Sequence, residues 1–560
     1  MSVIFDIAHK YVDELAALDP NAATALGVPG YDDQMTDYSP DGSEALAALD
    51  RRTLEQLAKA PADGEPDRIA RDVMTDRIGV RLEAHDAGEH LRSLRIIGSP
   101  LSSIRNVFDQ MPRATEGEWR NIAARLALVP QALAGFRRTL DLGIEHGLVA
   151  AQRQARECAK QAETWSGLRE GQPSFFATLV DGFDRSSIEA PSLRADLDAG
   201  ARAAEAAYAA FRDYLLGDYL ASAAPADGVG RERYALSSRR FNGCDLDLDE
   251  TYRWGWDELY RVEREIDATA EKIAPGQGVA GALHLLETDP ARSIDGVDAY
   301  RAWLQQLHDQ ALADLDGAHF DIDPRIKRVE VMIPPPGGAL AQYYSGPSED
   351  FSRPGRTWWP LGSRTRFAIW SDVSTAYHEG VPGHHLQVGA TRCVADRLSR
   401  YQRLLAFVSG HGEGWALYAE RLMGELGYLD NPDYYMGMLS AQAMRCVRVI
   451  IDIGMHLGLP IPATERFHPG ETWNHDLGLE FAVERSLHPR ELMASEVVRY
   501  LGWAAQAISY KVGERAWLAA REDARQREGA SFDLKRWHTR ALNLGPMGLE
   551  QLTRELARVG

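Results

Sequence analysis

Residues 377–387 read YHEGVPGHHLQ and contain the residue types from which a zinc-hydrolase site is built. His378 and Glu379 are adjacent, and His384 and His385 follow after a Gly-Val-Pro-Gly segment. An imidazole nitrogen is a good ligand for Zn²⁺, and a carboxylate beside the metal can accept a proton from a water molecule. The stretch therefore predicts metal-ligating histidines together with a catalytic base, Glu379.

The spacing of these histidines differs from the helical H-E-x-x-H motif, in which two histidines four residues apart share one helix face. Position i+4 from His378 is Pro382, which cannot ligate a metal. On an unbroken helix His378 and His385 would be separated by roughly 10 Å, which is too far to share one ion. Proline interrupts a helix, and a kink or bulge after Gly380 would return His384 to the i+4 place. We expect His384 to be the second ligand, with His385 as the alternative.

A third ligand is available in residues 409–421, which read SGHGEGWALYAER and predict an amphipathic helix with Glu413 in its first turn. A glutamate on a helix a few dozen residues downstream completes the two-histidine, one-glutamate set of zinc peptidases. Glu420 lies one heptad later, and we expect it to pair with an arginine. Glycine residues around Glu413 permit close approach of another backbone: Gly410, Gly412 and Gly414.

The sequence HEGVPGHHLQ followed by EGWALYAERL resembles the bacterial family called domain of unknown function 885, which is grouped with gluzincin-type metallopeptidases. Two further blocks resemble the family: MRCVRVIIDIGMH (444–456) and RYLGWAAQAISYKVG (499–513). The second block departs from the family pattern, which has Pro-Gly where this chain has Ala504 and Ala505. The resemblance is specific between about residues 328 and 545. It implies a mainly α fold, with a large helical body and a small β-sheet beside the zinc-binding helix, as in gluzincins and oligopeptidases.

The resemblance also suggests roles for residues outside the metal cluster. Similar enzymes stabilise the developing oxyanion with a tyrosine, and Tyr510 is our first choice for this role, with Tyr500 second. His456 becomes a candidate for a contact with the substrate or the transition state. An arginine that binds the terminal carboxylate of a substrate would make the enzyme an exopeptidase; each arginine can equally form a structural salt bridge. The residues assigned to substrate binding are Arg448, Arg499, Tyr500, Gln506 and Tyr344.

Composition and charge exclude several classes of partner. The chain has 560 residues and a net charge of −20, which argues against binding to nucleic acid or to an anionic membrane. Four cysteines are widely spaced without a C-x-x-C motif, so neither a disulfide framework nor a thiolate zinc site is indicated. The N-terminus lacks the long apolar core of a signal peptide, and no apolar run reaches the ~20 residues of a membrane span. We therefore expect a cytoplasmic protein.

The chain is expected to contain an N-terminal helical region, residues 1–327, and a metallopeptidase-like region, residues 328–560, packed as one continuous body. From Arg328 onward short β-like runs are broken by proline and glycine, as in RVEVMIPPP and RFAIWSD. An edge strand there would suit an extended peptide substrate. Helical patterns in the first region cover residues 1–27, 42–58, 67–90, 116–143, 150–164, 192–220 and 248–274.

These features predict a zinc-dependent metallopeptidase that hydrolyses short peptides, with carboxypeptidase action as one possibility. Zn²⁺ would be held by His378, His384 and Glu413, and Glu379 would serve as general base. One alternative is a metal-dependent hydrolase of a non-peptide amide or ester. The other is a helical peptide-binding protein without catalytic activity.

Overall fold

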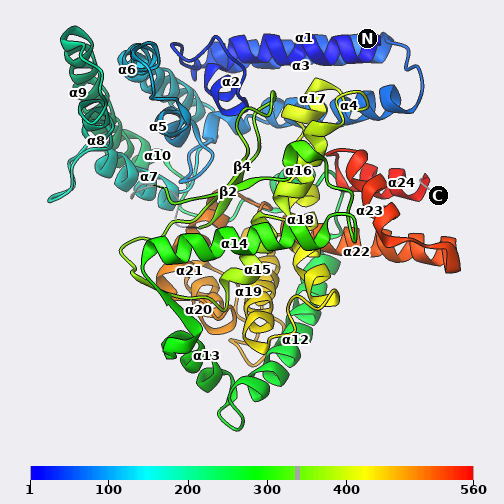
Figure 1. The fold of residues 1–560 in the computed structure, drawn as a ribbon. Coiled ribbons are helices and arrows are strands. Elements are labelled where there is room, and N and C mark those ends of the chain that lie inside the picture. The colour runs from blue at the N-terminus through cyan, green and yellow to red at the C-terminus, as the bar shows by residue number, and fades with distance from the viewer. Residues whose placement is uncertain (1, 335–340, 559–560) are drawn as a thin grey trace. The chain divides into compact units, whose positions relative to one another are not determined.

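The chain is mainly helical in the computed structural model, which describes residues 2–334 and 341–558 (Figure 1). It forms two compact units. Unit 1 contains Met1–Val229 and Ser495–Trp503, and unit 2 contains Gly230–Ala494 and Ala504–Gly560. The boundary expected from composition, at 327/328, lies inside unit 2, because α12 and its neighbours pack against later helices of that unit. That the whole chain packs as one continuous body stays a prediction.

Unit 1 is built from helices, and the amphipathic patterns of the sequence coincide with them. One difference concerns residues 1–27, which form two helices. Asp19 ends the first and caps the second, and Pro20 occupies the first position of the second, where proline is favoured. Gly27 then ends the second helix with a left-handed backbone, φ 75°. The helices are α1 (Val3–Leu18), α2 (Pro20–Leu26), α3 (Pro40–Lys59), α4 (Glu65–Asp86), α5 (Pro100–Gln110), α6 (Glu116–Glu145), α7 (Gln152–Trp165), α8 (Phe175–Asp184), α9 (Pro191–Tyr214) and α10 (Leu220–Ser222).

Unit 2 contains the remaining helices, and α12 and α19 pack along one another within it. α21 begins in unit 2 and ends in the segment that belongs to unit 1. No helix among the described residues is both long enough and apolar enough to cross a membrane. The helices are α11 (Arg231–Asn242), α12 (Leu248–Ile273), α13 (Gly278–Thr288), α14 (Val297–Leu315), α15 (Asp372–Glu379), α16 (His384–Cys393), α17 (Arg400–Leu404), α18 (Ser409–Glu425), α19 (Pro432–Leu457), α20 (His475–Arg485), α21 (Arg490–Gly502), α22 (Ser509–Glu528), α23 (Leu534–Asn543) and α24 (Leu549–Arg558).

Unit 2 also contains small sheets, as the β-like runs predicted. The strand order of the larger sheet is β2-β4-β3: β2 (Val329–Met332) is parallel to β4 (Gly355–Trp358), and β3 (Tyr343–Ser345) is antiparallel to it. A second pair joins β1 (Ser293–Asp295) to β5 (Arg366–Ala368). The part of the RVEVMIPPP run within residues 335–340 lies outside the described residues.

The two edges of the larger sheet differ in how they are covered. Gln305 of α14 donates to the carbonyl of Val329 and accepts from the N–H of Val331, at 2.9 and 3.1 Å, so its side chain covers the edge of β2. Among the described residues β3 forms the other edge strand, and its Tyr344 contacts His385 of α16. An extended peptide adds most readily at such an edge.

Close packing of α18 against α22 depends on glycine. A Cβ atom at Gly414 would overlap the backbone of Gly513, and one at Gly513 would overlap the carbonyl oxygen of Gly410. The two backbones therefore touch directly, as expected from the glycines around Glu413. This contact holds the first turn of α22, which contains Tyr510, next to the N-terminal part of α18, which contains Glu413.

Replacing Gly414 with alanine is expected to lower the free energy of unfolding by about 1–3 kcal/mol or more, because backbone atoms cannot move aside as a side chain can. Thermal and denaturant unfolding of the variant measure this loss. Gly79→Ala in α4 is the matched control. No atom lies within 4 Å of a Cβ built there, so alanine should be neutral or stabilising by about 0.5–1 kcal/mol. Equal stability of the two variants would contradict the close contact.

Candidate metal centre

A tight turn separates α15 from α16 and determines where the histidines point. α15 ends at Glu379, and α16 begins at His384. Within the turn the N–H of Gly383 donates to the carbonyl of Tyr377 at 3.0 Å. A Cβ atom at Gly383 would overlap the carbonyl oxygen of His378, so only glycine fits. The predicted interruption of the helix is therefore present, and it brings the His378 and His384 rings to a centroid separation of 4.9 Å.

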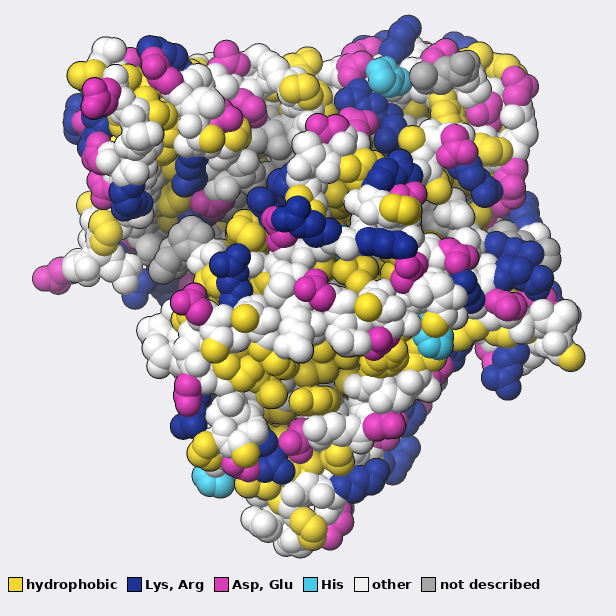
Figure 2. All heavy atoms as spheres, viewed as in Figure 1, with side chains coloured by type: hydrophobic (Ala, Val, Ile, Leu, Met, Phe, Trp, Pro, Cys, Tyr) yellow, Lys and Arg dark blue, Asp and Glu magenta, His cyan; other side chains and the backbone are white. Residues whose placement is uncertain are grey.

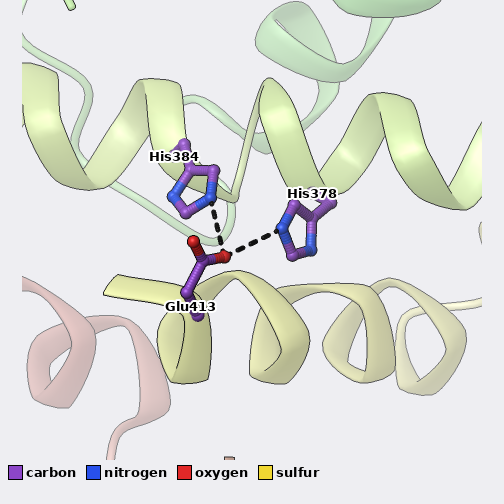
Figure 3. Close-up of side chains that lie close together, drawn as sticks. All are labelled: His378, His384 and Glu413. Carbon is purple, nitrogen blue, oxygen red and sulfur yellow. Dashed lines mark ion pairs between the residues drawn. The ribbon is translucent and has the colours of Figure 1, made fainter. Parts of the chain in front are cut away.

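Three side chains from three helices converge in unit 2 (Figure 3). His378 extends from α15, His384 from α16 and Glu413 from the N-terminal part of α18. Glu413 Oε2 lies 3.5 Å from His378 Nε2 and 3.4 Å from His384 Nε2. The three ligand atoms all lie within 4.8 Å of one another, and no other such group occurs among the residues that the structure describes.

These distances fit a bound zinc ion. Tetrahedral Zn²⁺ holds nitrogen and oxygen ligands at about 2.0–2.2 Å, which places neighbouring ligand atoms roughly 3.3–3.5 Å apart. The separations from Glu413 have this length and are longer than a usual N–H···O hydrogen bond. Two imidazoles and a carboxylate are also the ligand set of a catalytic zinc site with an open position. His378, His384 and Glu413 therefore suit Zn²⁺ in number, chemistry and spacing.

A buried carboxylate outside the cluster orients His378. Glu420 is 1% exposed, and its Oε1 accepts a hydrogen bond from His378 Nδ1 at 2.8 Å. Ser374 donates to the other oxygen of Glu420, and Arg445 lies 3.7 Å from Oε1. Because Nδ1 donates to Glu420, the lone pair of His378 Nε2 is directed toward Glu413 and remains available for a metal. The expected pairing of Glu420 with an arginine is present, through Arg445. The hydrogen bond with His378 was not expected, and it orients the His378 ring.

The charges of the metal-free cluster are strongly coupled. Burial lowers the pKa of His378, but its contacts with the carboxylates of Glu413 and Glu420 outweigh burial and raise that pKa to about 9. Burial raises the pKa of Glu413, whereas its contacts with the imidazoles of His378 and His384 hold that pKa well below its usual range. Without metal, a protonated His378 thus compensates the carboxylates around it.

Glu379 and Tyr510 lie beside the cluster. Glu379 is 7% exposed, and burial raises its pKa, while the positive charges of His378 and His384 oppose this rise. The ring of Tyr510 lies parallel to that of His378 with centroids 6.3 Å apart. The predicted base and the predicted oxyanion donor are therefore both close to the candidate ligands.

Two arginines of α19 lie over the ring of Tyr510. The guanidinium carbons of Arg445 and Arg448 are 5.5 and 4.7 Å from the ring centroid. Arg448, assigned to substrate binding, is 6% exposed. Arg445 is also close enough to Glu379 for its charge to lower the pKa of that carboxyl group. The arginines hold Tyr510 in place and add positive charge to this side of the site.

The structure decides between the two adjacent histidines. His385 Nε2 is 2.7 Å from the carbonyl of Ile326, and its Nδ1 is 3.0 Å from the hydroxyl of Tyr344. Both ring nitrogens of His385 thus have other partners, and His384 is the one of the two that belongs to the group able to hold a metal. Tyr344, expected to bind substrate, lies close to this pair, and its ring centroid is 6.4 Å from that of His384.

The structure places His456 apart from the cluster. It lies about 12 Å along α19 from Arg448, at a rise of ~1.5 Å per residue, and is 2% exposed. Its ring packs against Tyr234, and its Nε2 is 3.6 Å from Asp452. His456 therefore packs within unit 2, and its contact with the substrate or the transition state stays a prediction.

Other predicted substrate residues differ in their surroundings. Gln506 donates to the hydroxyl of Ser409, one helical turn before Glu413, at 3.3 Å. Arg499 and Tyr500 belong to unit 1, where both bond to Glu496 at 2.8 Å. Their assignment to the substrate site stays a prediction.

Two local features differ from or extend the expectations. Trp359, which follows β4, is fully buried against Tyr300 in the core of unit 2 and does not face a substrate. Ala505, where the family pattern has glycine, has a left-handed backbone, φ 64°, and its N–H donates to Asp452 at 2.9 Å. The turn at Ala504 and Ala505 therefore keeps a backbone conformation that favours glycine, although this chain has alanine there. The buried carboxylate of Asp452 holds the turn.

Sequence reasoning missed the part that α18 plays in supporting the site. Trp415 donates from its indole nitrogen to the carbonyl of Pro382 at 2.8 Å and so fixes the turn between α15 and α16. Glu413 and Glu420, seven residues apart, share one face of α18. This spacing was the available signal that both carboxylates face His378.

The chain belongs to the family described as "Bacterial protein of unknown function (DUF885)", whose sequence profile matches residues 20–556. This match covers nearly the whole chain and confirms the family to which the motifs pointed. A comparison with curated proteins gives no significant match.

Two solved structures are similar to the chain over almost its full length. A candidate lipoprotein from Colwellia psychrerythraea is 21% identical, with a TM-score of 0.86, and the match covers 100% of this chain and 99% of that one. A candidate lipoprotein of unknown function from Shewanella oneidensis is 16% identical, with a TM-score of 0.73 and coverage of 98% and 99%. At these identities the likeness shows the fold alone, and it supports the mainly helical architecture.

Replacing Glu420 with glutamine should weaken zinc binding by about 10- to 100-fold, because the orienting carboxylate of His378 is lost. Competition with a chromophoric chelator measures the dissociation constant. Glu425→Gln is the control on the same helix, since Glu425 is partly exposed and pairs with Arg521. Unchanged zinc affinity in Glu420→Gln would show that the bond from His378 does not orient the ligand.

Zinc binding at pH 7.5 should release about one proton, because His378 must lose the proton that its raised pKa retains in the metal-free protein. Below the unfolded-state pKa this proton contributes fully to the stability of the metal-free protein, and the contribution is lost as pH rises through about 9. Calorimetric titration with zinc in buffers of different ionisation enthalpy measures the release. A binding heat that is the same in every buffer would refute it.

Proposed function

We propose that this member of the DUF885 family is a zinc-dependent metallopeptidase that hydrolyses short peptides. The observation that carries the proposal is the convergence of His378, His384 and Glu413 at the mutual distances of zinc ligands, with Glu379 beside them. A scaffold without catalytic activity has no need of this set. As part of the same proposal, we assign the protein a gluzincin-type peptidase site.

Zn²⁺ bound there would act as a Lewis acid and make a water molecule acidic enough to attack near neutral pH. Glu379 accepts the proton of the attacking water and passes it to the leaving amine. Its burial raises its pKa, which suits a group that must hold and then release a proton. The neighbouring positive charges of His378, His384 and Arg445 oppose that rise.

Tyr510 donates from its hydroxyl to the oxygen on which negative charge develops. Its ring lies near the guanidinium groups of Arg445 and Arg448 and parallel to the ring of His378. β3, which approaches His384 and His385 through Tyr344, provides an edge along which an extended peptide backbone can pair. The chain's own residues thus supply a base, an oxyanion donor and a surface that aligns the substrate.

Cellular location and partners remain proposals as well. The net charge of −20 supports small peptides over nucleic acid as partners. A cytoplasmic location stays a prediction, and the two solved relatives, described as candidate lipoproteins, point to the alternative of a membrane-anchored protein.

Replacing Glu379 with glutamine should reduce kcat by about 10²- to 10⁴-fold, since the side chain keeps its size but cannot accept a proton. Hydrolysis of a library of short peptides by the zinc-loaded protein, followed by mass spectrometry, measures the activity. Zinc content should stay at the wild-type level in this variant, because Glu379 is not a ligand.

His378→Ala serves as the second variant and should lose both zinc and activity. Wild-type protein that holds zinc and cleaves no peptide, but does cleave other amides or esters, would replace the peptidase with a different hydrolase. Peptide binding by metal-free protein without any hydrolysis would favour a binding protein.

A further inference from the structure

Unit 2 contains a cluster of arginines near the candidate metal centre that the mechanism does not use. In Figure 2 dark blue side chains gather where Figure 1 labels β2 and β4. Such a concentration of positive charge is unexpected in a chain with a net charge of −20. Shared carboxylate partners and mutual charge effects define the cluster, whose members are Arg328, Arg353, Arg356, Arg392, Arg400 and Arg403.

Most of these arginines have a structural partner. Arg356 pairs with Glu330 across the strands β4 and β2 at 3.0 Å, and Arg328 pairs with the same carboxylate at 2.7 Å. Arg400 and Arg403 share Glu349 at 3.4 and 3.5 Å. These pairs explain their positions without any ligand.

Arg392 of α16 holds the loop after β3. Its Nη1 donates to the carbonyl of Pro347, and a Cβ atom at Gly346 would lie 3.6 Å from its Nε. That Nε is buried and has no hydrogen-bond partner. The Arg392 guanidinium is thus anchored through Nη1, while its Nε lacks a hydrogen-bond acceptor.

Like Arg392, Arg353 has no carboxylate within ion-pair distance among the described residues. Its guanidinium is partly buried, and burial together with the positive charge of Arg356 lowers its pKa. Withdrawing a cation from water without a counter-ion is unfavourable. A site for an anionic ligand accounts for this arrangement, because the ligand would provide the missing partner.

The position of Arg353 connects it to the metal centre. It lies two residues before Gly355, where a Cβ atom would overlap both the hydroxyl of Tyr344 and the Nδ1 of His385. The charges of Arg392 and Arg353 both act on Tyr344, lowering its pKa against the larger rise that burial causes. Tyr344 in turn lies 6.4 Å from His384, measured between ring centroids.

We propose that Arg353, which flanks Tyr344 together with Arg392, binds a carboxylate of the substrate beside the metal centre. This inference rests on the proposed peptidase function and specifies its substrate class. The carboxylate would lie on the Tyr344 side of the metal centre, because the charges of Arg353 and Arg392 both act on Tyr344 and the Tyr344 ring is near that of His384. Its source is either the C-terminus of a peptide or an acidic side chain.

The test uses zinc-loaded protein and matched, N-acetylated short peptides. In the first pair all side chains are neutral, and the two peptides differ in having a free or an amidated C-terminus. In the second pair both peptides are amidated, and they differ in containing glutamate or glutamine. Arg353→Gln should raise KM for the carboxylate-bearing peptide by about 10- to 100-fold and leave kcat within about threefold. KM for the neutral peptides should not change, and the affected pair identifies the source of the carboxylate.

Two further variants separate a binding role from a structural one. Arg353→Lys keeps the charge but not the planar fork, and should recover part of the affinity. Arg356→Gln removes the neighbouring arginine that already has a partner, and should leave the preference for carboxylate peptides unchanged. Zinc content and circular dichroism confirm that each variant is folded. An equal change in Arg353→Gln and Arg356→Gln, or an equal loss for neutral peptides, would overturn the proposal.

Failure of the peptidase function can be distinguished from failure of this subsite. If the wild-type protein cleaves no peptide, binding of the same peptides is measured with a fluorescent label. A preference for the carboxylate-bearing peptide that disappears in Arg353→Gln would support the subsite even though the peptidase had failed. Equal binding of both members of each pair by the wild-type protein would reject it.

Discussion

The turn between α15 and α16 is the constraint on which the candidate site depends. A continuous helix would separate His378 from the later histidines, and the break at residues 380–383 returns His384 to its side. Two interactions maintain the turn. Gly383 allows the backbone to pass close to the carbonyl of His378, and Trp415 donates to the carbonyl of Pro382 from α18. The same helix α18 supplies Glu413, so the turn and the third ligand are positioned together.

Burial of charge makes this arrangement costly without a cation. Glu379 and Glu420 are almost fully buried, and Glu413 is mostly so. Removing carboxylates from water is unfavourable unless they are paired. In the metal-free protein a protonated His378 and the nearby Arg445 supply the opposite charge. A divalent ion between His378, His384 and Glu413 would supply more positive charge at the place where the carboxylates meet, and so a metal explains both the geometry and the electrostatics.

Much of this site could be predicted from the sequence, because its main elements are local. The residues between His378 and His384 include a proline and two glycines, and this composition already required a break in the helix. The glycines around Glu413 indicated a close helix contact, which α22 provides through Gly513. The mainly helical fold followed from amphipathic patterns, most of which the structure reproduces. The predicted helices 1–27 and 192–220 are each divided, and α5 and α8 were not predicted.

Contacts between distant segments could not be predicted in the same way. The engagement of His385 by Tyr344 and Ile326 depends on how β3 packs against α16, and no local pattern contains that information. His456 seemed suited to catalysis by its motif, yet the length of α19 separates it from the cluster. The division into units also crosses the composition boundary, because packing partners of α12 come late in the chain. No sequence pattern indicates that Arg353 lacks a carboxylate partner, because the partners of the neighbouring arginines, Glu330 and Glu349, are known only from the structure.

The most direct test of the account is the metal content of the purified protein, measured by elemental analysis after dialysis against zinc and removal of unbound metal. The account predicts about one zinc ion per chain in the wild type and almost none in Glu413→Ala, which removes the ligand supplied by α18. A wild-type protein that retains no zinc, or a Glu413→Ala variant that retains as much as the wild type, would contradict the proposed metal centre.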